Sequence, residues 1–423
     1  MNRRAYDSAA VGSMLILMCA LCASESAAAA SAPAIPDKSV YRIVYGATLD
    51  PTNGRADVRI AVRQASQLLR RVEFIAPRDR YLDVHGQGKV ETTPQTIVWL
   101  PPADGGVLHF QYQIDRTRDN GVQDARITES WAMLKLDRLF PAATVRVVKG
   151  VRSKATLRLE APAGWSIETP YGSAAGRLRS VDDPKHRFNR PRGWLVAGKL
   201  TVRRDLIDDR RVVVASPEGT GFRSNDVLAF IRWTLPSLVQ VFPNVPERLL
   251  IVGAPEDMWR GGLSGAGSIY LHGDRPLISQ NGTSTLLHEM VHVVSSLHGT
   301  DGADWIVEGL AEYYSLALLR RSNTISERRF ENSFTALAQW SGATKCVATD
   351  RSSGPQTARA VLVMRALDLE IRGATHDKKS LDDLVRALTA ADTLVTNAAF
   401  RAGAVLLIGG PATALTECDE LAL

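Results

Sequence analysis

Cysteine is scarce in this sequence, with four residues among 423. Cys19 and Cys22 fall in an apolar segment near the N-terminus, which leaves Cys346 and Cys418 for the rest of the chain. Two cysteines allow one disulfide at most. In an oxidising compartment we expect Cys346 and Cys418 to pair, and two unpaired thiols are the alternative.

Runs of basic residues are also missing. The chain has 51 Lys and Arg against 45 Asp and Glu, and the basic residues are scattered without interleaved aromatic side chains. This pattern favours a solvated surface over a face that binds nucleic acid. Beyond the N-terminal segment, no stretch is long and apolar enough to span a bilayer, so we expect no integral membrane segment in the mature chain.

The first 30 residues have the pattern of a secretory signal. Arg3 and Arg4 precede an apolar run at residues 9–23, and small residues at 27–32 offer cleavage sites. The run is short for a membrane span. We therefore expect residues 1–30 to be a cleaved signal peptide and the mature protein to be periplasmic or secreted.

The pattern of apolar and polar residues in the remaining chain changes near residue 216. Residues 37–215 show short alternating apolar runs separated by turn residues, which predicts an N-terminal antiparallel β-sandwich-like domain. Residues 216–423 show mainly helical patterns. The sequence thus predicts an α+β protein with two domains. His85, His109 and His186 are isolated among the β-like segments, and we interpret them as structural or surface residues.

A metal-binding motif lies in the helical part. His288, Glu289 and His292 form H-E-x-x-H within an apolar segment preceded by good helix-starting residues. Residues four apart share a helix face, so both imidazoles can reach one ion, and Glu289 can handle a water as general base. An amphipathic helix with two solvated histidines is the alternative, but this segment is apolar nearly all round.

Catalytic zinc uses three protein ligands and one open position, so a third ligand is needed. A second helical pattern at residues 305–319 carries Glu308 and Glu312 on one face, four residues apart. Glu312 is a candidate for orienting a ligand imidazole. An exposed helix carboxylate is the alternative for this residue.

H-E-x-x-H followed by W-I-V-E-G-L-A-E-Y-Y resembles the gluzincin zinc peptidases, and within them most resembles the glycyl aminopeptidase family. The similarity includes the segments at 308–322 and 366–388. The resemblance implies a mainly helical, thermolysin-like catalytic domain at 216–423 that follows a β domain. It also implies one Zn²⁺ per chain with Glu308 as the third ligand, and a peptide or protein substrate.

The glycine-rich segment at 259–272 is the candidate substrate-binding strand. The resemblance implies that an edge strand here binds extended peptide through its main chain. Gly261, Gly262 and Leu263 match its start, but Ser264 stands where the related aminopeptidases carry a glutamate for the substrate amine. An ordinary glycine-rich turn is the alternative.

The tyrosine that such enzymes use to stabilise the oxyanion has no counterpart, because no tyrosine follows Tyr314. Thr357 falls near its position and is too short to replace it. His376 is a weaker candidate donor.

These observations predict an exported zinc-dependent peptidase, in which a zinc-bound water attacks the peptide bond and Glu289 is the general base. The alternative is a catalytically weak or inactive peptidase-fold protein that binds or scaffolds in the cell envelope. A zinc hydrolase acting on a non-peptide ester or amide is a third hypothesis.

Overall fold

The structure is a computed structural model that describes residues 39–119, 121–181, 187–344 and 349–416. The expected signal peptide, the pair Cys346 and Cys418, and His186 lie outside these described residues. The described residues belong to one compact unit. No helix in the described ranges is both long enough and apolar enough to cross a membrane.

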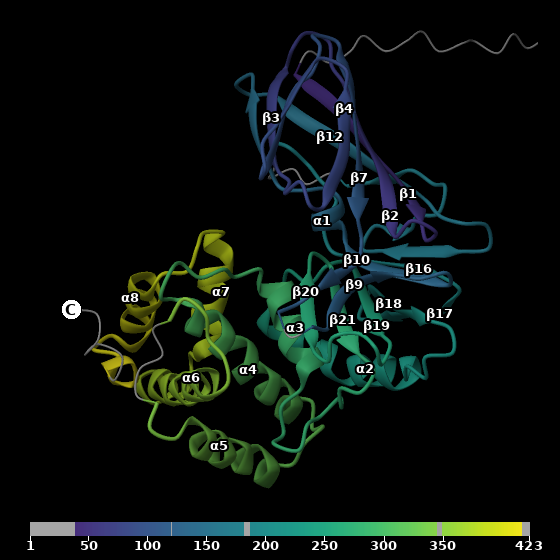
Figure 1. The fold of residues 1–423 in the computed structure, drawn as a ribbon. Coiled ribbons are helices and arrows are strands. Elements are labelled where there is room, and N and C mark those ends of the chain that lie inside the picture. The colour runs from purple at the N-terminus through teal and green to yellow at the C-terminus, as the bar shows by residue number, and fades with distance from the viewer. Residues whose placement is uncertain (1–38, 120, 182–186, 345–348, 417–423) are drawn as a thin grey trace, which may run out of the picture. The chain divides into compact units, whose positions relative to one another are not determined.

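Three sheets make up the first half of the described chain (Figure 1). The first has the order β15-β12-β1-β2-β7-β4, formed by Arg179–Ser180, Arg152–Glu160, Val40–Asp50, Arg55–Arg63, Gly105–Gln113 and Tyr81–Gly86. The second has the order β11-β3-β6-β5, formed by Ala143–Val147, Leu69–Ile75, Thr96–Leu100 and Lys89–Thr92. The third has the order β14-β13-β16-β10-β9-β8, formed by Gly172–Ser173, Ser166–Thr169, Trp194–Gly198, Trp131–Lys135, Gln123–Ile127 and Arg116–Thr117.

These strands form because apolar and polar residues alternate along them. In β1 the side chains of Tyr41, Ile43 and Tyr45 are buried, while the intervening residues face outward. Buried side chains from all three sheets join one hydrophobic core. The antiparallel pairing predicted for this region is confirmed for most neighbours, but β1 and β12 pair in parallel.

A fourth sheet is formed by strands that lie between the first three sheets and most of the helices in the sequence. Its order is β17-β18-β19-β21-β20, formed by Leu200–Ile207, Arg210–Pro217, Arg248–Ala254, Ser268–His272 and Gly262–Gly265. The predicted domain boundary between residues 215 and 216 falls inside β18. This strand pairs in parallel with β19, so the sheet joins segments from both sides of that boundary. Trp131, Trp194, Leu250 and Tyr270 belong to a separate apolar cluster between this sheet and the third one.

The helices gather mainly in the second half. They are α1 Leu136–Leu139, α2 Ser224–Val241, α3 Thr285–Ser295, α4 Asp304–Arg321, α5 Glu327–Ser341, α6 Pro355–Thr375, α7 Leu381–Ala391 and α8 Asn397–Ile408. All except α1 contribute to a second large core. The predicted α+β class is therefore confirmed. Ser380 and Asp383 form a capping box at the start of α7, whereas α2 has no side-chain cap and Ser224 is its first helical residue.

Candidate metal centre

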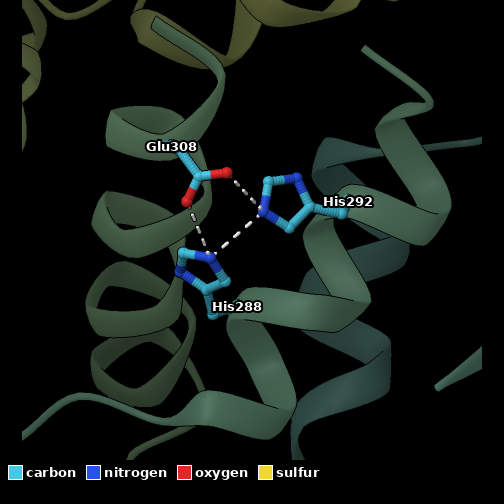
Figure 2. A group of neighbouring side chains, drawn as sticks. All are labelled: His288, His292 and Glu308. Carbon is cyan, nitrogen blue, oxygen red and sulfur yellow. Dashed lines mark hydrogen bonds and ion pairs between the residues drawn. The ribbon is translucent and has the colours of Figure 1, made fainter. Parts of the chain in front are cut away.

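Helix α3 presents both histidines of the motif on one face. The Ser284 side chain caps the helix by accepting a hydrogen bond from the Leu287 N–H, as its position in the sequence predicts. The apolar residues of α3 are buried, and the helix packs against α4 and β20. His288 and His292 are one turn apart and point toward α4 (Figure 2).

Helix α4 supplies the carboxylates. Glu308 and Glu312 are one turn apart on the side that faces α3, and most of the other side chains of α4 are buried. Gly309 permits the close packing of α6 on this turn, because a Cβ at this position would lie 2.8 Å from the Ala360 Cβ. The tight contact between α4 and α6 fixes the turn that carries Glu308.

Three ligand atoms converge between the two helices. The Nε2 atoms of His288 and His292 are 3.1 Å apart, and each is 3.3–3.4 Å from a carboxylate oxygen of Glu308. Tetrahedral zinc with bonds of about 2.0–2.1 Å separates its ligands by about 3.3 Å. The three side chains therefore fit a zinc ion without rearrangement of the backbone, and they are the one such group of three or more among the described residues.

Glu312 lies behind the first histidine rather than in the ligand cluster. Its Oε2 atom is 3.0 Å from Nδ1 of His288, so the Nδ1–H donates to this carboxylate and Nε2 is left to bind an ion. Ser315 donates a hydrogen bond to the Glu312 carbonyl oxygen and lies 3.4 Å from the same carboxylate. Because the side chain of Glu312 is largely buried, the structure does not leave it as a free surface carboxylate.

The environment sets the protonation of the two imidazoles in opposite directions. Burial opposes the charge of His288, but its hydrogen bonds to Glu308 and Glu312 prevail and raise its pKa well above the usual range. Burial and the nearby charge of His288 lower the pKa of His292 to about 4. At neutral pH His292 is therefore in the neutral form that binds metal ions, whereas His288 must release the proton from its Nε2 atom when an ion binds there.

Glu289 is held beside the cluster and apart from it. Its side chain is buried, and burial raises the pKa of its carboxyl, while a backbone hydrogen bond from Ser264 favours the charged form. Gly262 makes room for it, because a Cβ there would lie 2.8 Å from the Glu289 Cγ. Glu289 is thus positioned by the edge strand rather than by the ligands.

The predicted substrate strand is β20, at the edge of the fourth sheet. The Gly261 carbonyl accepts a hydrogen bond from the His272 N–H, and the Leu263 carbonyl accepts one from the Trp194 indole. Ser264 is engaged by two side chains, since its N–H donates to Glu289 and its carbonyl accepts from Lys135. The segment is an edge strand and not an isolated glycine-rich turn.

Lys135 is a residue of this site that sequence reasoning missed. Its Nζ atom donates to the Ser264 carbonyl oxygen at 2.8 Å, although the two residues are 129 positions apart. Lys135 ends a short apolar strand, and no motif surrounds it in the sequence. Only the packing of the third sheet against the fourth brings it to the edge strand.

Thr357 and His376, the two residues considered for the oxyanion role, lie at opposite ends of α6. Tyr313 and Tyr314 donate hydrogen bonds to Asp368 and Asp382, so these tyrosines serve the packing of the helices. Thr357 is in the first turn of α6. His376 is the left-handed residue that ends α6, with its side chain exposed.

Comparison with solved structures finds similar folds, among them an aminopeptidase N family protein and an aminopeptidase. The aminopeptidase N family protein from Idiomarina loihiensis matches 82% of this chain and 70% of its own, with a TM-score of 0.61 and 15% sequence identity. Legionella pneumophila aminopeptidase A, solved in complex with aspartic acid, matches 88% of this chain and 48% of its own, with a TM-score of 0.53 and 12% identity.

Comparison by sequence finds no family model and no curated protein that matches this chain. The chain spans about half the length of the Legionella enzyme. At these identities the structural similarity shows that the chain has an aminopeptidase-like fold.

Proposed function

We propose that this protein is a zinc-dependent peptidase of the gluzincin type, with relatives among the glycyl aminopeptidases. The observation that carries the proposal is the convergence of His288, His292 and Glu308 at ligand distances, with Glu312 behind one imidazole. Zinc bound by these side chains would polarise the scissile carbonyl and acidify a water molecule. The fold shared with two aminopeptidases supports a peptidase over an unrelated zinc protein.

Glu289 is the general base in this proposal. It accepts a proton from the attacking water and later delivers it to the leaving amine. Its burial excludes bulk solvent, and its hydrogen bond from Ser264 and the close approach of Gly262 limit its movement. The proton therefore moves to a carboxylate whose position is fixed before the substrate binds.

The substrate is a peptide or protein segment that lies along β20. This strand is at a sheet edge beside α3, where an extended peptide can add as a further strand. Export to the periplasm or the medium is part of the proposal and depends on residues 1–30. The two structural neighbours bear the name aminopeptidase, but Ser264 offers no carboxylate for an α-ammonium group.

The test combines metal analysis with a mixed peptide library. We expect the purified full chain to contain one zinc and to cleave peptides, and the Glu289→Gln variant to keep the zinc and lose turnover by about 10²–10⁴-fold. His85→Ala is the matched control, because His85 is an exposed strand residue in the first sheet. Zinc at full occupancy without turnover of any peptide would instead favour the binding or scaffolding alternative. A chain that binds no zinc would contradict the proposal.

A further inference from the structure

The side chain of Lys135 is mostly enclosed, yet it has no carboxylate in contact. Its Nζ atom donates one hydrogen bond, to the Ser264 carbonyl oxygen, and lies 5.2 Å from the centre of the Trp194 ring. Among the described residues it forms no ion pair within 4.0 Å. Burial correspondingly lowers the pKa of Lys135. An ammonium group has three donors, and enclosing it with no carboxylate in direct contact is costly, although Asp137 and Glu289 interact with its charge at longer range.

Lys135 also stands next to the reacting centre. The Ser264 carbonyl that accepts from Lys135 belongs to the residue whose N–H donates to Glu289, and the charges of Lys135 and Glu289 interact. One residue of the edge strand therefore connects the ammonium group with the general base. A substrate side chain close to the scissile bond would lie near the ammonium group of Lys135.

A second positive cluster flanks the start of the same strand. Arg116, Arg118 and Arg138 surround the buried carboxylate of Asp124 at 2.6, 3.6 and 3.3 Å. Three cations around one carboxylate leave an excess of two positive charges, and about a third of each arginine side chain is exposed.

Trp259 connects this arginine cluster to the edge strand. The guanidinium of Arg118 lies 4.1 Å from the centre of the Trp259 ring. The ring in turn occupies the space beside Gly261, where a Cβ would lie 2.0 Å from its nearest atom. The cluster therefore adjoins β20, and Arg138 is close enough to Lys135 to interact with its charge.

We propose that Lys135 binds a substrate carboxylate next to the scissile bond, and that the arginine cluster attracts acidic peptides to this subsite. This inference rests on the proposed peptidase function and names its substrate class: peptides with an acidic residue beside the cleaved bond. An α-ammonium group at the same place is repelled by Lys135. Lys135 is a specificity-determining residue and not part of the proton transfer.

The test measures equilibrium binding, so that it does not depend on turnover. In the zinc-loaded Glu289→Gln full chain, two N-acetylated peptides that differ only by Asp or Asn beside the scissile bond are compared by calorimetry. We expect the acidic peptide to bind at least about tenfold more tightly, the range expected of a hydrogen bond to a charged group. Lys135→Met should remove this difference, and Lys135→Arg should retain most of it.

Lys199→Met is the matched control, because the Lys199 side chain is exposed. The backbone N–H of Lys199, which donates a hydrogen bond to the Ser130 carbonyl oxygen, is unchanged by the substitution. Thermal unfolding of each variant separates loss of the subsite from loss of the fold. If Lys135→Met does not fold, the comparison of the two peptides is made with Lys135→Arg. Equal affinity for the Asp and Asn peptides, or a preference that survives Lys135→Met, would overturn the subsite while leaving peptidase activity intact. A chain without zinc or turnover would overturn the proposed function instead.

Discussion

Nδ1 of His288 lies 3.0 Å from Oε2 of Glu312, and this contact joins the two helices behind the ligand cluster. The carboxylate fixes both the tautomer and the ring orientation of His288. Because Glu312 is one turn after Glu308, the same stretch of α4 provides a ligand and the group that orients another ligand. The affinity for zinc should therefore depend on a residue that does not touch the ion.

Glu312→Ala should weaken zinc binding by about 10–100-fold, as loss of such an orienting group does in other zinc sites. Competition with a chelator of known affinity measures the effect. Glu256→Ala, at an exposed position, is the control and should leave the affinity unchanged. Unaltered zinc affinity in Glu312→Ala would show that His288 is oriented by other contacts.

His292→Ala should lower zinc occupancy sharply, because His288 and Glu308 alone make a poor site for a four-coordinate ion. Elemental analysis of the purified chain measures the ratio of zinc to protein. Full occupancy in this variant would remove His292 from the ligand set.

Gly262→Ala should reduce turnover by about 10²-fold or more while zinc is retained. The added methyl group would lie 2.6 Å from Thr285 and 2.8 Å from Glu289, so it displaces the general base or the strand. Gly373→Ala is the matched control, because Gly373 is a helical residue with open space around its Cα. The control should be neutral or stabilising by up to about 1 kcal/mol. Normal kinetics in Gly262→Ala would mean that Glu289 remains functional when the added methyl group displaces it or the strand.

Asp382→Ala should lower the free energy of unfolding by about 3 kcal/mol. The carboxylate accepts two hydrogen bonds from Arg321, at 2.8 and 2.9 Å, and one from the buried Tyr314 hydroxyl. Removing it leaves a partly buried guanidinium without its partner. Denaturant unfolding measures the loss, and Glu91→Ala, which breaks an exposed pair with Lys89, should change stability by less than about 1 kcal/mol. Equal losses of unfolding free energy in both variants would show that the Asp382 contacts contribute no more than an exposed ion pair.

N-acetylated peptides should be cleaved at least as well as peptides with a free N-terminus. Ser264 provides no carboxylate for an ammonium group, and Lys135 places a positive charge at its carbonyl. A comparison of kcat/KM for matched blocked and free peptides measures this preference. A strong preference for free amines would show that another carboxylate recognises them.

The sequence alone determined the local features of the site. The spacing of His288 and His292 places both on one face of any α-helix, and the Ser284 cap follows from a hydrogen bond within one turn. The helical pattern at 305–319 is found within Asp304–Arg321, because helix periodicity is set by residues close in the chain. The identity of Glu308 came from the resemblance, since spacing along a separate helix fixes no distance to α3.

Only the tertiary structure decided how distant segments meet. The parallel pairing of β1 with β12, and of β18 with β19 across the expected boundary at residue 215, depends on which strands find one another during folding. The contact between Lys135 and Ser264 has no local cause, because two sheets must pack before the ammonium group reaches the edge strand. Residue patterns fix periodicity and caps, whereas the charge beside Glu289 arises from long-range packing.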